Sequence, residues 1–302
     1  MPRLSVWPCS FNKKLATIEF EGGDVSDITI EPEGTFSAEA LGRWRDRFPK
    51  DYALDSVSQD DMRDSVMALG VTKLPKRSII VADAMLQQFP PNLLTINGIG
   101  AGFKHAIGLI PSLEWLTASR RLDRKGNGAA RMWIPVSPAE DEPGPLVMMA
   151  DEVAPILDAH GVELERGEQP SPGFADTDVA IIGAHGGLAE VNRYFRSLSD
   201  DGHSITEIAQ IAEVTRMSRL TILFVCSGGR IDLHPETGMA IGLAKQILAR
   251  GSAAVIGPAW PIPFFVARPW LDAFLKAWQE GMMSLDACHA ANRYVSEKTR
   301  RR

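Results

Sequence analysis

The second half of the chain alternates continuous apolar segments with amphipathic ones, and this alternation restricts the fold more than any other feature. The apolar segments are short and uninterrupted, as in strands buried on both faces, and the segments between them have helical spacing. Such an order predicts a mostly parallel sheet covered by helices on both faces. The predicted strands are 131–137, 162–168, 178–186, 220–229 and 253–260, and the predicted helices are 146–161, 204–214, 238–251, 265–281 and 284–298.

The front of the chain has a different pattern, so we predict a smaller α+β accessory region over 1–70 and the main α/β domain over 71–302. Segments 15–20 and 25–30 flank two glycines and predict a hairpin. Segments 37–48 and 58–70 predict helices opened by serine N-caps. Past residue 70, the sequence predicts a strand at 77–83, a second short strand at 91–96 and a helix at 111–122.

Composition excludes several classes of protein. The net charge of −6 over 302 residues argues against a nucleic-acid surface, and the basic tail at 298–302 is typical of a solvated chain end. No apolar stretch reaches the ~20 residues that cross a bilayer, and the start lacks the apolar region of a signal peptide, so we expect a cytoplasmic protein. Three scattered cysteines predict neither a disulfide framework nor a metal site. Cysteine chemistry would therefore use a free thiol.

Two predicted strands end in residues that carry chemistry. His185 is followed by Gly186 and Gly187 at the end of one strand, and Cys226 is followed by a serine and two glycines at the end of another. Because the carboxyl ends of parallel strands lie along one edge of a sheet, we expect the two side chains to lie near each other. An imidazole that takes the proton of a thiol turns it into a nucleophile.

The reaction of a thiolate with a carbonyl also needs donors for the oxyanion that forms. We predict the backbone N–H groups of Gly186 and Cys226 for this role, since glycine allows a close approach of a substrate carbonyl. The alternative interpretation is that the cysteine is a small core residue and the histidine an ordinary loop residue. Their joint occurrence at two strand ends favours the functional interpretation.

Three other segments resemble known binding or catalytic motifs but lack a residue or spacing that each motif requires. Segment 98–103 has Phe103 where a dinucleotide fingerprint needs its third glycine. In the loop after Cys226, Asp232 stands where a phosphate-binding cysteine loop needs arginine. Cys288 and His289 are adjacent on a predicted helix, so their side chains diverge.

Four segments together resemble the CHAT family of caspase-like cysteine peptidases. They are 110–116 (IPSLEWL), 184–187 (AHGG), 224–229 (FVCSGG) and 242–262 (GLAKQILARGSAAVIGPAWPI). The resemblance covers most of 71–302 and implies a caspase-like three-layer α/β/α sandwich. It also implies that His185 is the general base and acid and Cys226 the nucleophile of peptide-bond cleavage through a thioacyl intermediate. The chemistry of this family needs no cofactor, although some members require calcium for activation.

The sequence departs from the family in ways that bear on specificity and regulation. Trp260 and Pro261 continue into an apolar segment, 262–265, where relatives often have acids, which predicts an apolar substrate wall. Phe224 stands where relatives that cut after Arg or Lys commonly have an acid, so we expect cleavage after an apolar or small residue. Phe224 could also simply fill the core, and Asp178 or Asp232 could supply a charge from neighbouring loops. The helical repeats of many relatives are absent, so activation would need a protein partner or a modification.

The resemblance implies a regulated bacterial effector, in a defence or regulatory setting, and we expect it to cleave a specific protein substrate encoded nearby. One alternative is a catalytically silent CHAT-like scaffold that binds a protein partner in the same cleft. A second alternative is a cysteine hydrolase of another fold, with its histidine downstream of the nucleophile. The order of His185 before Cys226 favours the caspase-like arrangement.

Overall fold

The computed structural model describes the backbone of three N-terminal strands and most of the chain from residue 74 to 299. The residues outside this description are 1–2, 8–15, 22–23, 31–73, 83–85, 89, 98, 122–127, 137–143, 189–194, 199, 201–204, 234–239, 260 and 300–302. The predicted helices at 37–48 and 58–70 and Trp260 therefore lie outside the described residues.

The chain divides into two compact units, one made of 1–118 with 232–240 and the other of 119–231 with 241–302. This division differs from the predicted one after residue 70, because strands on the two sides of that position share a sheet. β1 (Arg3–Trp7) pairs in parallel with β4 (Arg77–Ala82), and β4 pairs in parallel with β7 (Ala106–Ile110). The strand predicted at 77–83 thus belongs to the N-terminal unit.

The first unit contains the predicted hairpin. β2 (Ala16–Glu21) and β3 (Asp24–Ile30) pair antiparallel, and β2 also pairs antiparallel with β1. The second predicted strand, 91–96, is shorter than expected: Pro91–Leu93 forms a 3-10 turn, and only β5 (Thr95–Ile96) is extended. The remaining described elements of this unit are a 3-10 turn at Leu86–Gln88, β6 (Ile99–Gly100), α3 (Ala101–Lys104) and β14 (Asp232–Leu233), while α4 (Leu113–Arg121) crosses into the second unit.

The second unit is built on a parallel sheet with the strand order β9–β8–β10–β13–β16. β10 extends beyond its parallel neighbours and continues antiparallel with β11, which pairs with β12. Their bounds are β8 (Ala130–Ile134), β9 (Glu163–Arg166), β10 (Val179–Leu188), β11 (Phe195–Leu198), β12 (Ile205–Thr206), β13 (Leu220–Val225) and β16 (Val255–Ile256). The predicted parallel sheet is confirmed.

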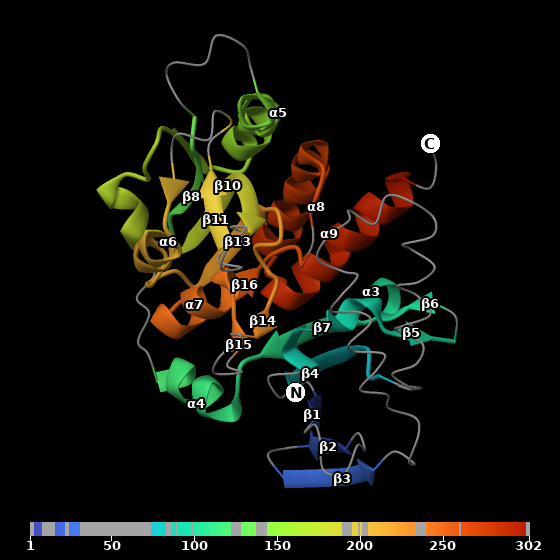
Figure 1. Cartoon of the computed structure of the whole chain (residues 1–302). Helices are drawn as coiled ribbons and strands as arrows, with labels where there is room; N and C mark the ends of the chain where they lie inside the picture. Colours follow the sequence, from blue (N-terminus) through green and yellow to red (C-terminus); the bar gives the residue numbers. More distant parts are fainter. Residues whose placement is uncertain are drawn as a thin grey trace. The chain divides into compact units, whose positions relative to one another are not determined.

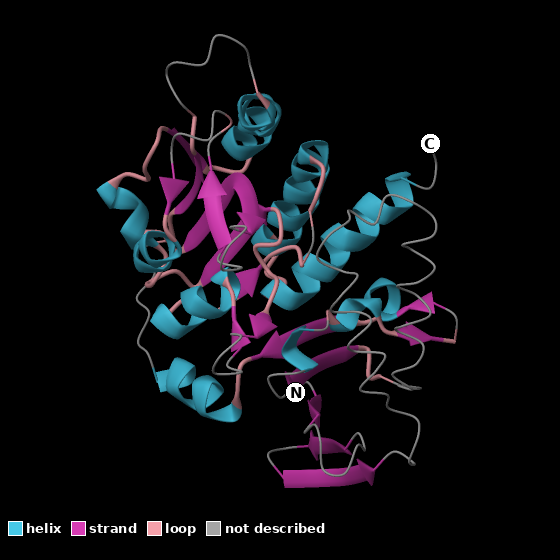
Figure 2. Ribbon diagram, viewed as in Figure 1, coloured by secondary structure: helices cyan, strands magenta, loops and turns pink. Residues whose placement is uncertain are grey.

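Helices cover both faces of this sheet, as the ribbons of Figures 1 and 2 show. One face packs against α5 (Pro145–Ala159), α8 (Ala267–Gln279) and α9 (Ser284–Thr299). The other face packs against α6 (Ile208–Val214), α7 (Leu243–Arg250) and the 3-10 segment Pro172–Asp176. A 3-10 turn at Phe264–Val266 completes the unit, and β15 (Ala240–Ile241) spans the boundary between the two units.

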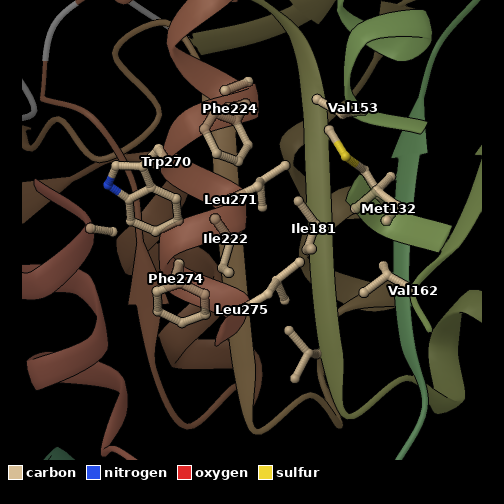
Figure 3. Close-up of a cluster of buried hydrophobic side chains, with 14 of the residues drawn as sticks. Met132, Val153, Val162, Ile181, Ile222, Phe224, Trp270, Leu271, Phe274 and Leu275 are labelled. Carbon is tan, nitrogen blue, oxygen red and sulfur yellow. The ribbon is translucent and has the colours of Figure 1, made fainter. Parts of the chain in front are cut away.

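The two cores follow from the alternation of side chains along the buried strands. All six residues of β13 are buried. Ile222 and Phe224 pack with α8, as Figure 3 shows, while Leu223 and Val225 pack with the α6–α7 layer. A strand buried on both faces is a nearly continuous apolar run, which is why β13 has no polar alternation. Its one polar side chain, Thr221, is hydrogen-bonded to Ser252 at 3.0 Å.

Candidate functional site

His185 lies where β10 leaves the parallel sheet. Val179–Ala184 pair in parallel with β13, and from His185 onwards β10 pairs antiparallel with β11, His185 lying opposite Leu198. The sequence change from apolar residues to His-Gly-Gly coincides with this change of partner. The histidine side chain is 39% exposed, so it is reachable from solvent.

Cys226 is the first residue of the turn that ends β13. The N–H of Gly228 donates to the carbonyl of Val225 at 2.8 Å, and the N–H of Arg230 donates to the carbonyl of Ser227 at 3.0 Å. Ser227 has a φ of 58°, a left-handed conformation that is uncommon outside glycine. Residues held in such conformations are concentrated at functional sites.

The register of the two strands brings His185 and Cys226 to adjacent strand ends. The parallel pairing ends with Ala184 opposite Val225. The next residue is His185 on β10 and Cys226 after β13. Neighbouring strands lie about 4.8 Å apart. The two strand ends are therefore neighbours in the sheet, as the predicted proximity of the two side chains requires.

The contacts of both side chains lie on the face of the sheet that α5 and α8 cover. Phe224, near the end of β13, packs in the core beneath α8. The Cys226 thiol lies 3.9 Å from the carbonyl oxygen of Ile262, whose side chain packs against that same core. His185 contacts Asp200, which binds the N-terminus of α5 on this face.

The thiol donates its hydrogen bond to the Ile262 carbonyl and not to the His185 ring. A hydrogen bond between nucleophile and base is often loose or absent before substrate binds. Cys226 is partly exposed, as a nucleophile must be. For proton transfer to His185, the thiol has to turn from the carbonyl towards the imidazole.

Asp200 is a member of this site that the sequence did not reveal. Its Oδ1 lies 2.6 Å from Nε2 of His185, and its side chain is only 7% exposed. Because a carboxylate can only accept, Nε2 is the donor. Within the part of the chain that the structure describes, Nδ1 of His185 has no hydrogen-bond partner.

The Asp200 carboxylate is also the N-terminal cap of α5. The N–H of Leu146 donates to its two oxygens at 3.1 and 2.9 Å, and the N–H of Val147 donates at 3.4 Å. The residue that caps a helix N-terminus ordinarily stands directly before the helix in the sequence. Asp200, in contrast, lies 54 residues after Leu146 of the first turn. No sequence signal distinguishes it from the other acids of the chain.

The remaining predicted residues fall in different places. Gly186 lies on β10 opposite Ser197, next to His185. Pro261 is half-buried and directly precedes Ile262, which contacts the thiol. Asp232 begins β14, and its side chain, like the whole of Trp260, is outside the description.

Phe224 is part of the core. Its side chain is 8% exposed, and its ring meets Trp270 of α8 edge-to-face with centroids 5.6 Å apart (Figure 3). The ring therefore fills the space between β13 and α8, as the alternative interpretation of this residue expected. It does not line an open site in this arrangement.

A second cysteine of this unit lies in a different environment. Although part of Cys288 is exposed, burial of its thiol raises its pKa to about 12, and Asn292, whose amide lies 3.8 Å from the sulfur, opposes this only in part. A thiol with so high a pKa is unreactive at neutral pH. Cys288 is therefore an internal control for the chemistry of Cys226.

The described residues contain no group of three metal-ligating side chains. None of the helices that the structure describes is both long and apolar enough to cross a bilayer. No protein-family model matches the chain, and no curated protein matches it.

Proposed function

We propose that the chain is a cysteine endopeptidase in which His185 and Cys226 form the catalytic dyad. The observation that supports this most is the register of β10 and β13, which ends one residue before each of the two. The fold we propose for the second unit is caspase-like, with its catalytic residues at the ends of adjacent parallel strands. The strand order of the sheet and the helices on both faces are compatible with it.

In the proposed reaction the Cys226 thiol gives its proton to Nδ1 of His185, and the thiolate attacks the carbonyl carbon of the scissile peptide. Backbone N–H groups of Gly186 and Cys226 stabilise the oxyanion. The imidazolium then protonates the leaving amine, and a thioester to Cys226 remains. Water, activated by His185, hydrolyses the thioester and restores the thiol.

The segment beside the nucleophile supports a preference for apolar residues in the substrate. Ile262 contacts the thiol through its carbonyl, and the exposed residues that follow it, Pro263 and Phe265, are apolar. Phe265 is 59% exposed, so its ring is available to a partner. A basic substrate side chain would meet no described carboxylate on this segment, and burial of an unpaired charge is costly.

The proposal is tested by incubation of the full chain with candidate protein partners encoded in the same operon. We expect the wild type and the Cys288→Ala variant to cleave the substrate, and the Cys226→Ala and His185→Ala variants to lose cleavage at least about 10³-fold. Sequencing of the new termini should show apolar or small residues before the cut.

Cleavage that survives Cys226→Ala refutes the dyad, and cuts made mainly after Arg or Lys refute the proposed preference.

A second candidate function is a silent scaffold that binds a partner protein at the same site. The bond of the Cys226 thiol to the Ile262 carbonyl, and not to His185, favours it. Stable binding of a partner by both wild type and Cys226→Ala, without cleavage by either, would support the scaffold. The setting of a regulated, cytoplasmic bacterial effector remains part of the proposal.

A further inference from the structure

We propose that Asp200 is the positioning residue of the dyad and that the N-terminus of α5 holds it in place. The inference rests on the proposed function and adds to it a third residue and a helix that controls the orientation of the base. It starts from the 2.6 Å contact between Asp200 Oδ1 and His185 Nε2.

The contact decides which ring nitrogen acts as the base. A neutral imidazole carries one N–H, and a carboxylate partner takes that hydrogen. With Nε2 as the donor to Asp200, Nδ1 carries the lone pair. Nδ1 is therefore the atom that accepts the proton of Cys226, and the carboxylate stabilises the imidazolium that results.

The helix fixes the carboxylate. Two N–H groups of the first turn of α5, at Leu146 and Val147, donate to Asp200, and the positive end of the helix dipole favours its negative charge. Gly144, at the N-cap, gives the carboxylate its space, because a Cβ at this position would collide with Oδ2 and Cγ of Asp200. The sequence Gly144-Pro145 thus leaves room for an acid that is distant in the sequence.

The helix also packs on the strand that carries the histidine. Cε of Met149 on α5 occupies the space that a Cβ at Gly183 would fill, so α5 contacts β10 close to the histidine. His185 is two residues further along the strand. Movement of α5 relative to β10 would therefore displace Asp200 from the histidine.

The alternative is that Asp200 serves only as a helix cap. A cap would stabilise α5 but would not change the protonation chemistry of the dyad. The reactivity of Cys226 at different pH values separates the two roles, because only a positioning residue affects thiolate formation near neutral pH.

The experiment measures the rate of Cys226 alkylation by iodoacetamide at pH 7 and pH 10 in the full chain. Partners behind a functional histidine are worth roughly 10–100-fold in metal sites, and we expect Asp200→Asn to slow alkylation at pH 7 by at least about tenfold. At pH 10 hydroxide removes the thiol proton without help from the histidine, so the rates of the variant and the wild type should agree within about twofold.

Asp151→Asn is the matched control, since Asp151 lies on the same helix but forms an exposed ion pair with Arg166 at 2.8 Å. It should leave both rates unchanged. Gly144→Ala keeps every charge but displaces the carboxylate, and should reproduce the selective loss at pH 7. The inference is overturned if the ratio of the alkylation rates at pH 7 and pH 10 is the same in Asp200→Asn and Gly144→Ala as in the wild type.

If both variants fail to fold, the tautomer of His185 in the wild type decides the question by nitrogen-15 NMR at pH 8. The inference expects the hydrogen on Nε2, and a hydrogen on Nδ1 would overturn it. None of these measurements uses a peptide substrate. The role of Asp200 can therefore be refuted without any measurement of cleavage. The proposed function, in contrast, is refuted if the Cys226→Ala variant still cleaves its substrate.

Discussion

At the scale of single residues, Cys226 and Cys288 show how surroundings decide the reactivity of one side-chain type. Cys226 follows the buried strand β13, whose end lies beside the part of β10 that leads into His185, and the cysteine is partly exposed. Cys288 lies within α9, packs against the main core, and has a pKa raised to about 12 by burial. In the sequence these two cysteines are alike, and the difference between them comes from the residues packed around each.

We therefore expect a selective modification at neutral pH. Iodoacetamide at pH 7 should label Cys226 at least about tenfold faster than Cys288, because the thiolate is the reactive form and burial suppresses it at Cys288. Peptide mass spectrometry after partial reaction measures both rates in one sample. Equal labelling in the native protein, at a rate below that of the unfolded chain, would contradict the assignment of Cys226 as the reactive thiol.

At the scale of elements, the turn after β13 is held against the end of β16. The N–H of Gly229 donates to the carbonyl of Pro258 at 2.8 Å. A Cβ at Gly229 would collide with the backbone carbonyl of Gly257, and backbone atoms cannot move aside as a side-chain end can. The glycines that follow Cys226 thus allow the two strand ends to approach, in addition to any role in substrate binding.

The Gly229→Ala substitution should therefore destabilise the protein by about 1–3 kcal/mol, as is usual for overpacking. Urea unfolding of the variant and the wild type measures this difference. The displaced turn should also slow alkylation of Cys226 at pH 7. A variant with wild-type stability would show that the approach of the turn to Gly257 is not needed.

At the scale of the whole molecule, burial of the Cys288 thiol couples global stability to alkaline pH. The folded state holds the thiol proton until about pH 12, whereas the ordinary pKa is 9.0. Between these values the unfolded chain binds fewer protons than the folded one, so the free energy of unfolding falls as the pH rises. Well below pH 9 both states keep the proton, so the effect disappears there.

We expect wild-type stability to fall by up to about 1.4 kcal/mol per pH unit above pH 9 from this group alone. Other groups also titrate there, so the measurement is the difference between wild type and Cys288→Ala in urea unfolding at pH 8 and pH 10. The variant should lose less stability over this interval. Parallel losses in the two proteins would show that the Cys288 thiol does not contribute.

The two units show where sequence patterns stop predicting the fold. The alternation over 131–298 correctly predicted the parallel sheet and the helices on its faces, because each buried strand is a local run of apolar residues. One boundary was wrong: residues 205–206, predicted as the start of a helix, form β12, and α6 begins at Ile208. The strand at 77–83 was assigned to the main domain because it follows residue 70 in the chain. In the structure it pairs with β1, more than seventy residues earlier, and so belongs to the N-terminal unit. Pairing between distant strands leaves no mark in the pattern of either one.

The sequence by itself determined that a histidine and a cysteine end two buried parallel strands, because apolar runs and glycine turns are local properties of the chain. Only the tertiary structure decided which strands are neighbours, with Ala184 opposite Val225, and which acid reaches the histidine. Asp200 meets His185 and the first turn of α5 through hydrogen bonds, and these depend on the direction and position of each group in space. That geometry is absent from any single segment of the sequence.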